Sequence, residues 1–343
     1  MIPQFEPDIS LDYANAVKSQ IQSGWIGTSD ATLEFENRLE DLTGRKFVIS
    51  TTSGTTAIIM ALKALDIKKK VLFPAYTFIA GANAAKFLNL EVELVDIKED
   101  TLCMNPDIVQ EKLNGGDIGC VIFVNHNGYN GSDIQKIQEL CKNFDVPMIE
   151  DSAQCIGIPN TCINGDISIL SFSVPKLVTT GQGGAVLTDN EDISIKLKQI
   201  RDQGDNWRST KIHSDLGVNF KFNDILASLG NAQLEIFDHL LYRRKFLWNV
   251  YRTYIPIIDF GLLSTWMVLY KSENSDLIIS ALKENNIQSV KYYKPINHNP
   301  PFADGKVYDV AESVYKNTVY LPSSLTLGER NIRTICQIIN AVG

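Results

Sequence analysis

The sequence lacks several features that would assign a protein to a class at once. Its 343 residues contain only four histidines and six cysteines, and no two cysteines are spaced as Cys-x-x-Cys. Because the histidines are scattered, we expect no metal site. The cysteines are too sparse for a disulfide framework, so we expect free thiols in a reducing cytoplasm.

Basic charge and long apolar runs are also scarce. The 32 Lys and Arg residues are outnumbered by 40 Asp and Glu residues, which gives a net charge of −8. Nucleic-acid backbones need a basic face, so we expect no nucleic-acid partner. No apolar run reaches the length of a membrane span, and the first residues carry neither a basic nor an apolar leader. These absences favour a cytoplasmic protein with small-molecule partners and no membrane contact.

Apolar strands alternate with amphipathic helices over the first two thirds of the chain. We expect strands at residues 47–50, 71–73, 91–97, 120–124, 146–149, 166–170 and 185–187. Strands separated by helices predict an α/β fold with three layers around a mostly parallel central sheet.

The length suggests about two domains. We place a large domain at residues 1–230 and a smaller C-terminal α+β domain at 231–343, and the N-terminal segment is a candidate to pack on the small domain. We expect one helix from residue 223 to about 254.

Two short patterns point to the carboxyl-terminal edge of the sheet. Residues 51–56 read Thr-Thr-Ser-Gly-Thr-Thr between an expected strand and an apolar helix. Such a turn aims backbone N–H groups and hydroxyls at an anion, although a capped helix start without a ligand has the same pattern. Glu150 and Asp151 end another strand, at the edge where open α/β sheets bind ligands. Because neighbouring strand residues face opposite ways, we expect only one of these carboxylates at a given site.

One lysine stands in a glycine-rich stretch between two strands. Residues 171–184 read Ser-Phe-Ser-Val-Pro-Lys-Leu-Val-Thr-Thr-Gly-Gln-Gly-Gly, in which glycines allow close approach of the backbone to a ligand. A lysine in such a turn has three possible roles: a surface charge, a phosphate contact or an amine that forms a Schiff base. At this point the sequence leaves all three open for Lys176. Together with the anion turn, Phe78 and Asp151, it meets the needs of pyridoxal 5′-phosphate (PLP). The phosphate needs N–H groups, the ring a flat partner, the pyridine nitrogen an anion and the aldehyde a lysine.

With these motifs in place, the chain resembles the DegT/DnrJ/EryC1/StrS family of PLP-dependent nucleotide-sugar aminotransferases, which have the type I PLP-dependent transferase fold. The matching stretches follow the family's order: Gly-Trp-Ile at 24–26, Ser-Gly-Thr-Thr-Ala at 53–57, Pro-Ala-Tyr-Thr-Phe at 74–78, Val-Asp-Ile at 95–97, Glu-Asp-Ser-Ala-Gln at 150–154, Ser-Phe at 171–172 with Lys176, Thr-Thr-Gly-Gln-Gly-Gly at 179–184, Gly-Val-Asn-Phe at 217–220 and Leu-Pro-Ser-Ser at 321–324. This shared order is more specific than any single motif.

The resemblance implies a role for each matching position. Lys176 would hold PLP as an internal aldimine and then move a proton between the substrate carbon and the cofactor. The other implied cofactor contacts are Asp151 at the pyridinium, Gln154 beside the ring hydroxyl, Phe78 stacked on the ring, and Gly54, Thr55 and Ser171 at the phosphate. Asn219 would reach the phosphate of the neighbouring subunit in a homodimer. Trp25, Ile26 and Thr28 would lie near the sugar.

The resemblance also implies a reaction. The amino group would pass from L-glutamate to C3 or C4 of a keto-deoxy sugar linked to UDP, GDP or dTDP, for surface polysaccharide such as lipopolysaccharide O-antigen, or for another glycan. Lysine at position 176 favours amination, because a relative with histidine there removes a hydroxyl instead. A PLP-dependent dehydratase or lyase of the same fold, or a catalytically silent PLP- or nucleotide-sugar-binding protein, stays an alternative. Departures at 125–128, Lys221 and 297–299 leave the nucleotide contacts unassigned.

Overall fold

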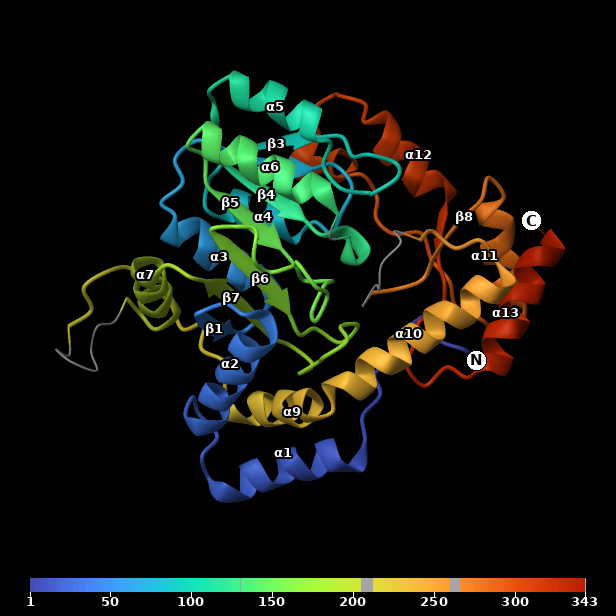
Figure 1. The fold of residues 1–343 in the computed structure, drawn as a ribbon, viewed down its shortest axis with the longest axis horizontal. Coiled ribbons are helices and arrows are strands. Elements are labelled where there is room, and N and C mark those ends of the chain that lie inside the picture. The colour runs from blue at the N-terminus through green and yellow to red at the C-terminus, as the bar shows by residue number, and fades with distance from the viewer. Residues whose placement is uncertain (130, 205–211, 260–265, 343) are drawn as a thin grey trace.

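The computed structural model describes residues 1–129, 131–204, 212–259 and 266–342, and a seven-stranded sheet lies at its centre (Figure 1). The spatial order is β1-β7-β6-β5-β4-β2-β3. The strands are β1 Phe47–Thr51, β2 Lys70–Pro74, β3 Val92–Val95, β4 Ile118–Val124, β5 Met148–Asp151, β6 Ile167–Ser171 and β7 Gly184–Thr188. Only β7 runs antiparallel to its neighbours in this sheet, so the expected mostly parallel sheet is confirmed.

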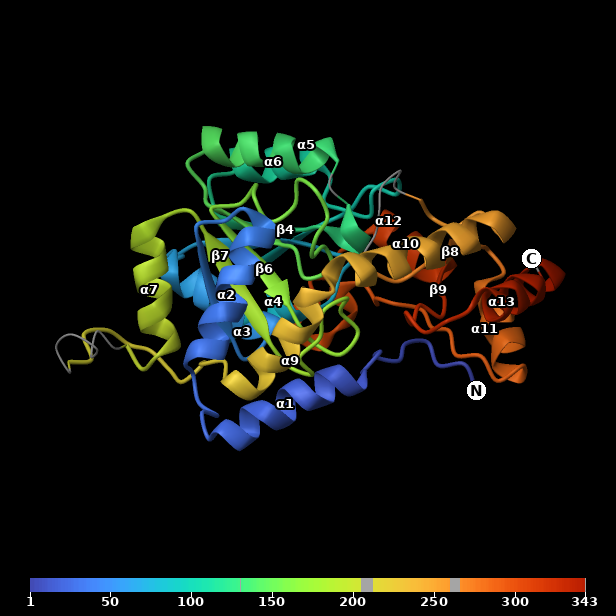
Figure 2. The ribbon, with the colours of Figure 1, turned by 60° about the horizontal axis from the view of Figure 1, so that its bottom comes forward.

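Helices cover both faces of the sheet, as the alternation of strands and helices predicts. The helices of this part are α1 Leu11–Ser23, α2 Asp30–Thr43, α3 Gly54–Ala64, α4 Ala80–Phe87, α5 Pro106–Asn114, α6 Ser132–Asn143 and α7 Glu191–Arg201. Phe73 packs in the apolar core under α3 and α4, whereas its neighbour Leu72 packs in the core under α5 and α6. This alternation follows from the two-residue period of a strand and produces the three layers (Figure 2).

The described residues of the C-terminal part form five α-helices and a small sheet. Its elements are α9 Asp224–Glu235, α10 Phe237–Tyr254, β8 Leu269–Lys271, α11 Ser275–Glu284, α12 Asp309–Asn317, β9 Thr318–Tyr320 and α13 Glu329–Val342, with β8 antiparallel to β9. The expected single helix over 223–254 is wrong, because the backbone leaves helical geometry at Ile236 (φ −110°, ψ 26°). Beside this small sheet, Val290 forms an isolated antiparallel bridge with Tyr320.

A separate apolar core forms between α10, α11 and α13 and includes residues of β8 and β9. The N-terminal segment contacts this part of the chain. Ile2 forms a parallel bridge with Ile287, and the carbonyl of Gln4 accepts a hydrogen bond from the N–H of Ser323 at 2.9 Å. The first residues are therefore held beside the C-terminal part of the chain.

Two further sequence expectations concern thiols and membranes. All six cysteines are free and buried, so none forms a disulfide. Among the helices that the structure describes, none combines the length and apolarity needed to cross a bilayer.

Asp96, from the Val-Asp-Ile motif, joins the two parts of the chain. Tyr308, the N-cap residue of helix α12, provides no side-chain cap hydrogen bond. The carboxylate of Asp96 accepts hydrogen bonds from the N–H groups of Val310 and Ala311, each at 3.0 Å. A carboxylate at this position caps the helix and complements its dipole. Asp96 thus provides the missing cap from the end of β3.

We expect Asp96→Ala to lower the free energy of unfolding by about 1–2 kcal/mol, because the first turn of α12 loses its cap. Asp96→Asn should lose less, since its amide oxygen still accepts one bond. Urea unfolding followed by circular dichroism measures both. Asp107→Ala is the matched control: Asp107 is an exposed first-turn residue of α5, and its loss should stay within about 0.5 kcal/mol. Equal losses at both positions would contradict the capping role.

Candidate active site

A cavity of about 470 Å³ lies at the carboxyl-terminal edge of the sheet. Its floor comes from the ends of β4, β5 and β6 and from the turns that follow β1 and β2. Seven of the residues predicted from the sequence line it together: Gly54, Thr55, Phe78, Asp151, Gln154, Ser171 and Lys176. The opposite wall comes from the C-terminal part and the N-terminal segment. Parallel strands explain this gathering, because their carboxyl ends share one edge.

The turn before α3 presents free backbone donors to the cavity. Ser53 and Thr56 satisfy each other in a capping box, with Ser53 Oγ accepting from Thr56 N at 3.1 Å and Thr56 Oγ1 accepting from Ser53 N at 2.9 Å. The N–H groups of Gly54 and Thr55 bond to no described residue. A Cβ atom added to Gly54 would lie 3.0 Å from Cβ of Ser171, so glycine permits this close approach. The helix N-terminus therefore offers unpaired donors for an anion.

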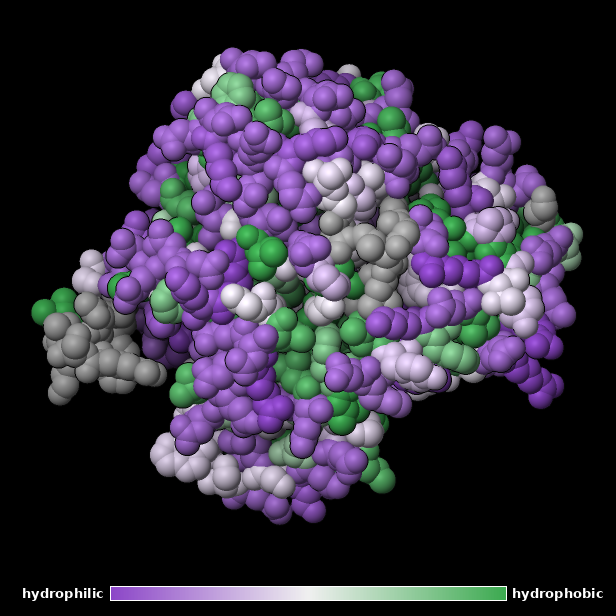
Figure 3. All heavy atoms as spheres, in the orientation of Figure 1, coloured by the Kyte–Doolittle hydropathy of each residue, from purple (hydrophilic) through white to green (hydrophobic). Residues whose placement is uncertain are grey.

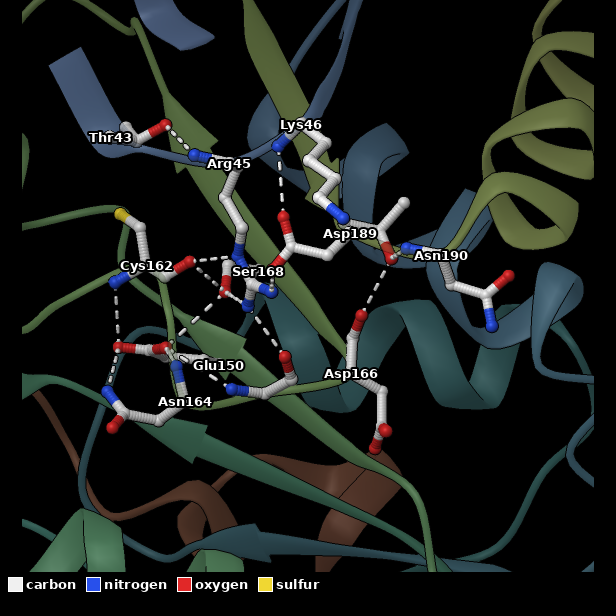
Figure 4. Close-up of polar contacts among 12 residues, drawn as sticks. Thr43, Arg45, Lys46, Glu150, Cys162, Asn164, Asp166, Ser168, Asp189 and Asn190 are labelled. Carbon is white, nitrogen blue, oxygen red and sulfur yellow. Dashed lines mark hydrogen bonds and ion pairs between the residues drawn. The ribbon is translucent and has the colours of Figure 1, made fainter. Parts of the chain in front are cut away.

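The two acidic residues that end β5 face opposite sides of the sheet, as strand alternation predicts. Glu150 is fully buried away from the cavity and accepts hydrogen bonds from the N–H groups of Cys162 and Asn164 at 2.9 and 2.8 Å (Figure 4). Arg45 lies in the same cluster, where it donates to the carbonyl of Gly165 at 2.6 Å and pairs with Asp189 at 2.8 Å. Glu150 therefore anchors the loop after β5 and is not available to a ligand.

Asp151 lines the cavity instead. Its carboxylate accepts a hydrogen bond from the N–H of Ala153 at 3.0 Å. Burial raises the pKa of Asp151 above its ordinary value, while the bond from Ala153 and the charge of Lys176 act in the opposite direction. A cation placed beside this carboxylate would lower its pKa again, so the site favours a positively charged partner.

The amine of Lys176 points into the same cavity. Its Nζ atom lies 3.9 Å from the centroid of the Trp266 ring and forms no ion pair or hydrogen bond with the residues that the structure describes. Burial lowers the pKa of Lys176 to about 8, and the charge of Asp151 limits the decrease. More of this amine is therefore neutral, and nucleophilic, near neutral pH than for a lysine with the ordinary pKa.

Two further predicted residues flank these groups. Gln154 accepts a hydrogen bond from the N–H of Asn127 at 2.7 Å through Oε1. The ring of Phe78 is 58% exposed and lies edge-on to Tyr293, with 6.0 Å between the centroids. An exposed aromatic ring in a cavity wall is free to contact a flat ligand.

The four remaining predicted residues do not line the cavity of the single chain. Trp25 and Ile26 are 70% and 51% exposed on the loop after α1. Thr28 donates its hydroxyl to the carbonyl of Phe222. Asn219 is exposed and accepts a hydrogen bond from the N–H of Lys221 at 3.3 Å. Their roles in ligand binding stay predictions.

Sequence reasoning missed the opposite wall of the cavity. That wall consists of Gln4, Trp266, Met267, Tyr292 and Tyr293. Except for Gln4, these residues lie in the C-terminal third of the chain, which carries few recognisable motifs. Their aromatic character was a usable signal, since aromatic residues are common in ligand cavities, but nothing local to them indicated which edge of the sheet they approach.

Comparison with known proteins adds to this geometry. The sequence profile described as the DegT/DnrJ/EryC1/StrS aminotransferase family matches residues 7–340. The chain belongs to this family. GDP-perosamine synthase of Escherichia coli O157:H7 is 26% identical over 359 residues, which cover 99% of this chain and 98% of that protein. A UDP-4-amino-4,6-dideoxy-N-acetyl-beta-L-altrosamine transaminase of Campylobacter jejuni is 34% identical over 233 residues, 64% of this chain and 60% of that protein.

A solved structure agrees with the fold. NtdA from Bacillus subtilis, with bound cofactor PMP, superposes with a TM-score of 0.87 at 25% identity, covering 96% of this chain and 81% of that one. The predicted type I PLP-dependent transferase fold and the PLP cofactor are thereby confirmed, and the protein is an aminotransferase. The residues present fit this cofactor, because the cavity combines free donors at α3, the Asp151 carboxylate and the Lys176 amine.

The pKa of Lys176 leads to a stability test. In the unfolded chain this amine has its ordinary pKa near 10.5, so between about pH 8 and 10.5 the unfolded state binds more protons and stability rises with pH. We therefore expect the cofactor-free Lys176→Met variant to be more stable than the wild type at pH 7, because methionine removes the buried charge. The expected gain in the free energy of unfolding is only about 1–2 kcal/mol, since water in the cavity hydrates part of the ammonium group. The difference should shrink from pH 8 to 10. Urea unfolding at several pH values measures it, and a difference independent of pH would contradict the lowered pKa.

Proposed function

We propose that this aminotransferase transfers an amino group from L-glutamate to C3 or C4 of a nucleotide-linked keto-deoxy sugar. The carrying observation is the cavity in which the Lys176 amine and the Asp151 carboxylate meet the free donors at the start of α3. The names of the E. coli and C. jejuni relatives support a nucleotide sugar as substrate, with GDP in one and UDP in the other. Synthesis of a surface polysaccharide or glycan in the cytoplasm is the pathway that we propose for the product.

The proposed roles follow from position in the cavity. The Lys176 amine would hold the cofactor and, once free, would move the proton at the substrate carbon. Asp151 would hold the cofactor at its ring nitrogen and favour the protonated form, and the bound group would supply an electron-withdrawing ring. The remaining contacts that we propose are Gly54, Thr55 and Ser171 at the phosphate, Phe78 on the ring face and Gln154 near the ring hydroxyl.

We further propose a homodimer in which Asn219 reaches the neighbouring subunit's phosphate and Trp25, Ile26 and Thr28 lie near the sugar. The exposure of Trp25 and Ile26 supports an interface, because large exposed apolar side chains mark contact surfaces. Apolar side chains also gather near the junction of α9 and α10 on the face in Figure 3. The boundary near residue 230 stays a proposal that the separate core between α10, α11 and α13 supports.

The visible absorption spectrum tests this function first. The purified protein should show the yellow band of lysine-bound PLP, and L-glutamate should convert it to the pyridoxamine form. Lys176→Ala should abolish the band and reduce turnover by about 10²- to 10⁴-fold, the usual contribution of a general acid–base group. Lys142→Ala, on the distant helix α6, is the matched control and should leave both unchanged. A band that ignores glutamate would contradict the donor, and a fully active Lys176→Ala enzyme would contradict the whole proposal.

Asp151→Asn tests the second group. The amide keeps the shape of the side chain but removes the charge that stabilises a protonated ring nitrogen, so we expect turnover to fall by about 10²- to 10³-fold, the range for loss of one preorganised electrostatic group. PLP binding, followed by the same absorption band, should persist. Glu150→Gln is the comparison across the strand: it should lower thermal stability while altering turnover much less. A larger loss of turnover in Glu150→Gln than in Asp151→Asn would contradict the proposed contact between Asp151 and the ring nitrogen.

A further inference from the structure

An aromatic ring from the C-terminal third of the chain lies against the amine of Lys176. Trp266 is only 4% exposed and lies three residues before β8, on the wall opposite the sheet. The centroid of its ring is 3.9 Å from Lys176 Nζ. Within the described chain no carboxylate comes within 4 Å of this ammonium group. The ring face therefore occupies the place that an acidic partner takes for most buried lysines.

We propose that Trp266 is a positioning residue for Lys176, whose ammonium form it holds in the cavity through a cation–π contact. An indole face attracts a cation more strongly than other aromatic rings, and the attraction grows where water is excluded. The ring thus stabilises the charged form that burial disfavours, without the tight ion pair that would keep the amine permanently protonated. This inference rests on the proposed role of Lys176 as the PLP-binding lysine.

Packing holds Trp266 in place, so a rigid side chain makes the contact with Lys176. Its neighbour Met267 is equally buried and accepts a hydrogen bond from Nε2 of Gln4 at 2.8 Å. Both residues pack in the apolar core that also contains Ile149 and Ile169 of the central sheet. The C-terminal part therefore sets the charge state of a lysine on the sheet side of the cavity.

A pair of substitutions separates the ring's electrostatic effect from its bulk. Trp266→Leu keeps an apolar side chain but removes the π face, and Trp266→Phe keeps a weaker π face. The control is Trp248→Leu on α10, because Trp248 is also buried, at 2% exposure, but lines no part of the cavity. Circular dichroism and thermal unfolding establish that each variant is folded.

The measured quantity is the midpoint pH for acetylation of Lys176 by acetic anhydride in the cofactor-free full-length protein, followed by peptide mass spectrometry. Removing a contact that favours the ammonium form shifts the midpoint to lower pH. We expect a decrease of about 0.5–1.5 pH units for Trp266→Leu, which is a three- to thirtyfold change in the ammonium-to-amine ratio. Trp266→Phe should fall between that value and the wild type, and Trp248→Leu should match the wild type.

Three results would overturn the proposal. The midpoint could be the same in the wild type and both Trp266 variants, it could rise in Trp266→Leu because admitted water stabilises the ammonium, or Trp248→Leu could shift it equally. PLP uptake, followed by its absorption band, separates this proposal from the proposed function. A wild type that never forms the band contradicts the function, whereas a band with unchanged midpoints contradicts only the role of Trp266.

Discussion

The cost of placing an ammonium group in a cavity governs the arrangement around Lys176. A charged amine loses hydration there, and the structure compensates with weak partners: an indole face at 3.9 Å and the more distant charge of Asp151. A close ion pair would restore the ordinary pKa and leave almost no neutral amine at neutral pH. Because these partners offset only part of the lost hydration, the pKa of Lys176 is about 8. The ammonium form is still tolerated in the cavity, and the neutral form is available as a nucleophile. Because Lys176 and Asp151 form no close ion pair, the Asp151 carboxylate remains available to another cation.

Strand geometry then decides which acidic residue belongs to the site. Glu150 and Asp151 are adjacent in sequence and chemically alike, yet the pleat sends Glu150 into a polar cluster with Arg45 and Asp151 into the cavity. The polar cluster stabilises the loop that follows β5, because Glu150 accepts hydrogen bonds from N–H groups of that loop. A register shift of one residue would exchange the two environments and bury the wrong carboxylate, so the anchoring by Glu150 indirectly fixes the orientation of Asp151.

Local sequence patterns were sufficient for the sheet side of the site and insufficient for the rest, for a physical reason. Gly54, Asp151 and Lys176 lie at or just after the ends of strands, and the residues next to each of them in sequence indicate its chemistry. Parallel strands bring such strand ends to one edge of the sheet. The break at Ile236 was missed because apolar periodicity continues through it. Trp266 and Tyr293 were missed because their place depends on tertiary packing over more than 80 residues of sequence separation from Lys176. Trp25 and Asn219 are exposed in the single chain, so no packing within it assigns them a ligand.

The long-range contacts that escape sequence reasoning also make the cavity a property of both parts of the chain. Asp96 caps α12, the hydroxyl of Tyr76 donates to the carbonyl of Tyr292, and the carbonyl of Ala75 accepts from Ile296 at 2.8 Å. All three contacts start from the ends of β2 and β3, which belong to the same sheet edge as the active site. The edge that presents Asp151 and Lys176 therefore also holds the wall that faces them. Each of these hydrogen bonds has a modest net strength. Several are therefore needed to keep the wall that contains Trp266 close to the Lys176 amine.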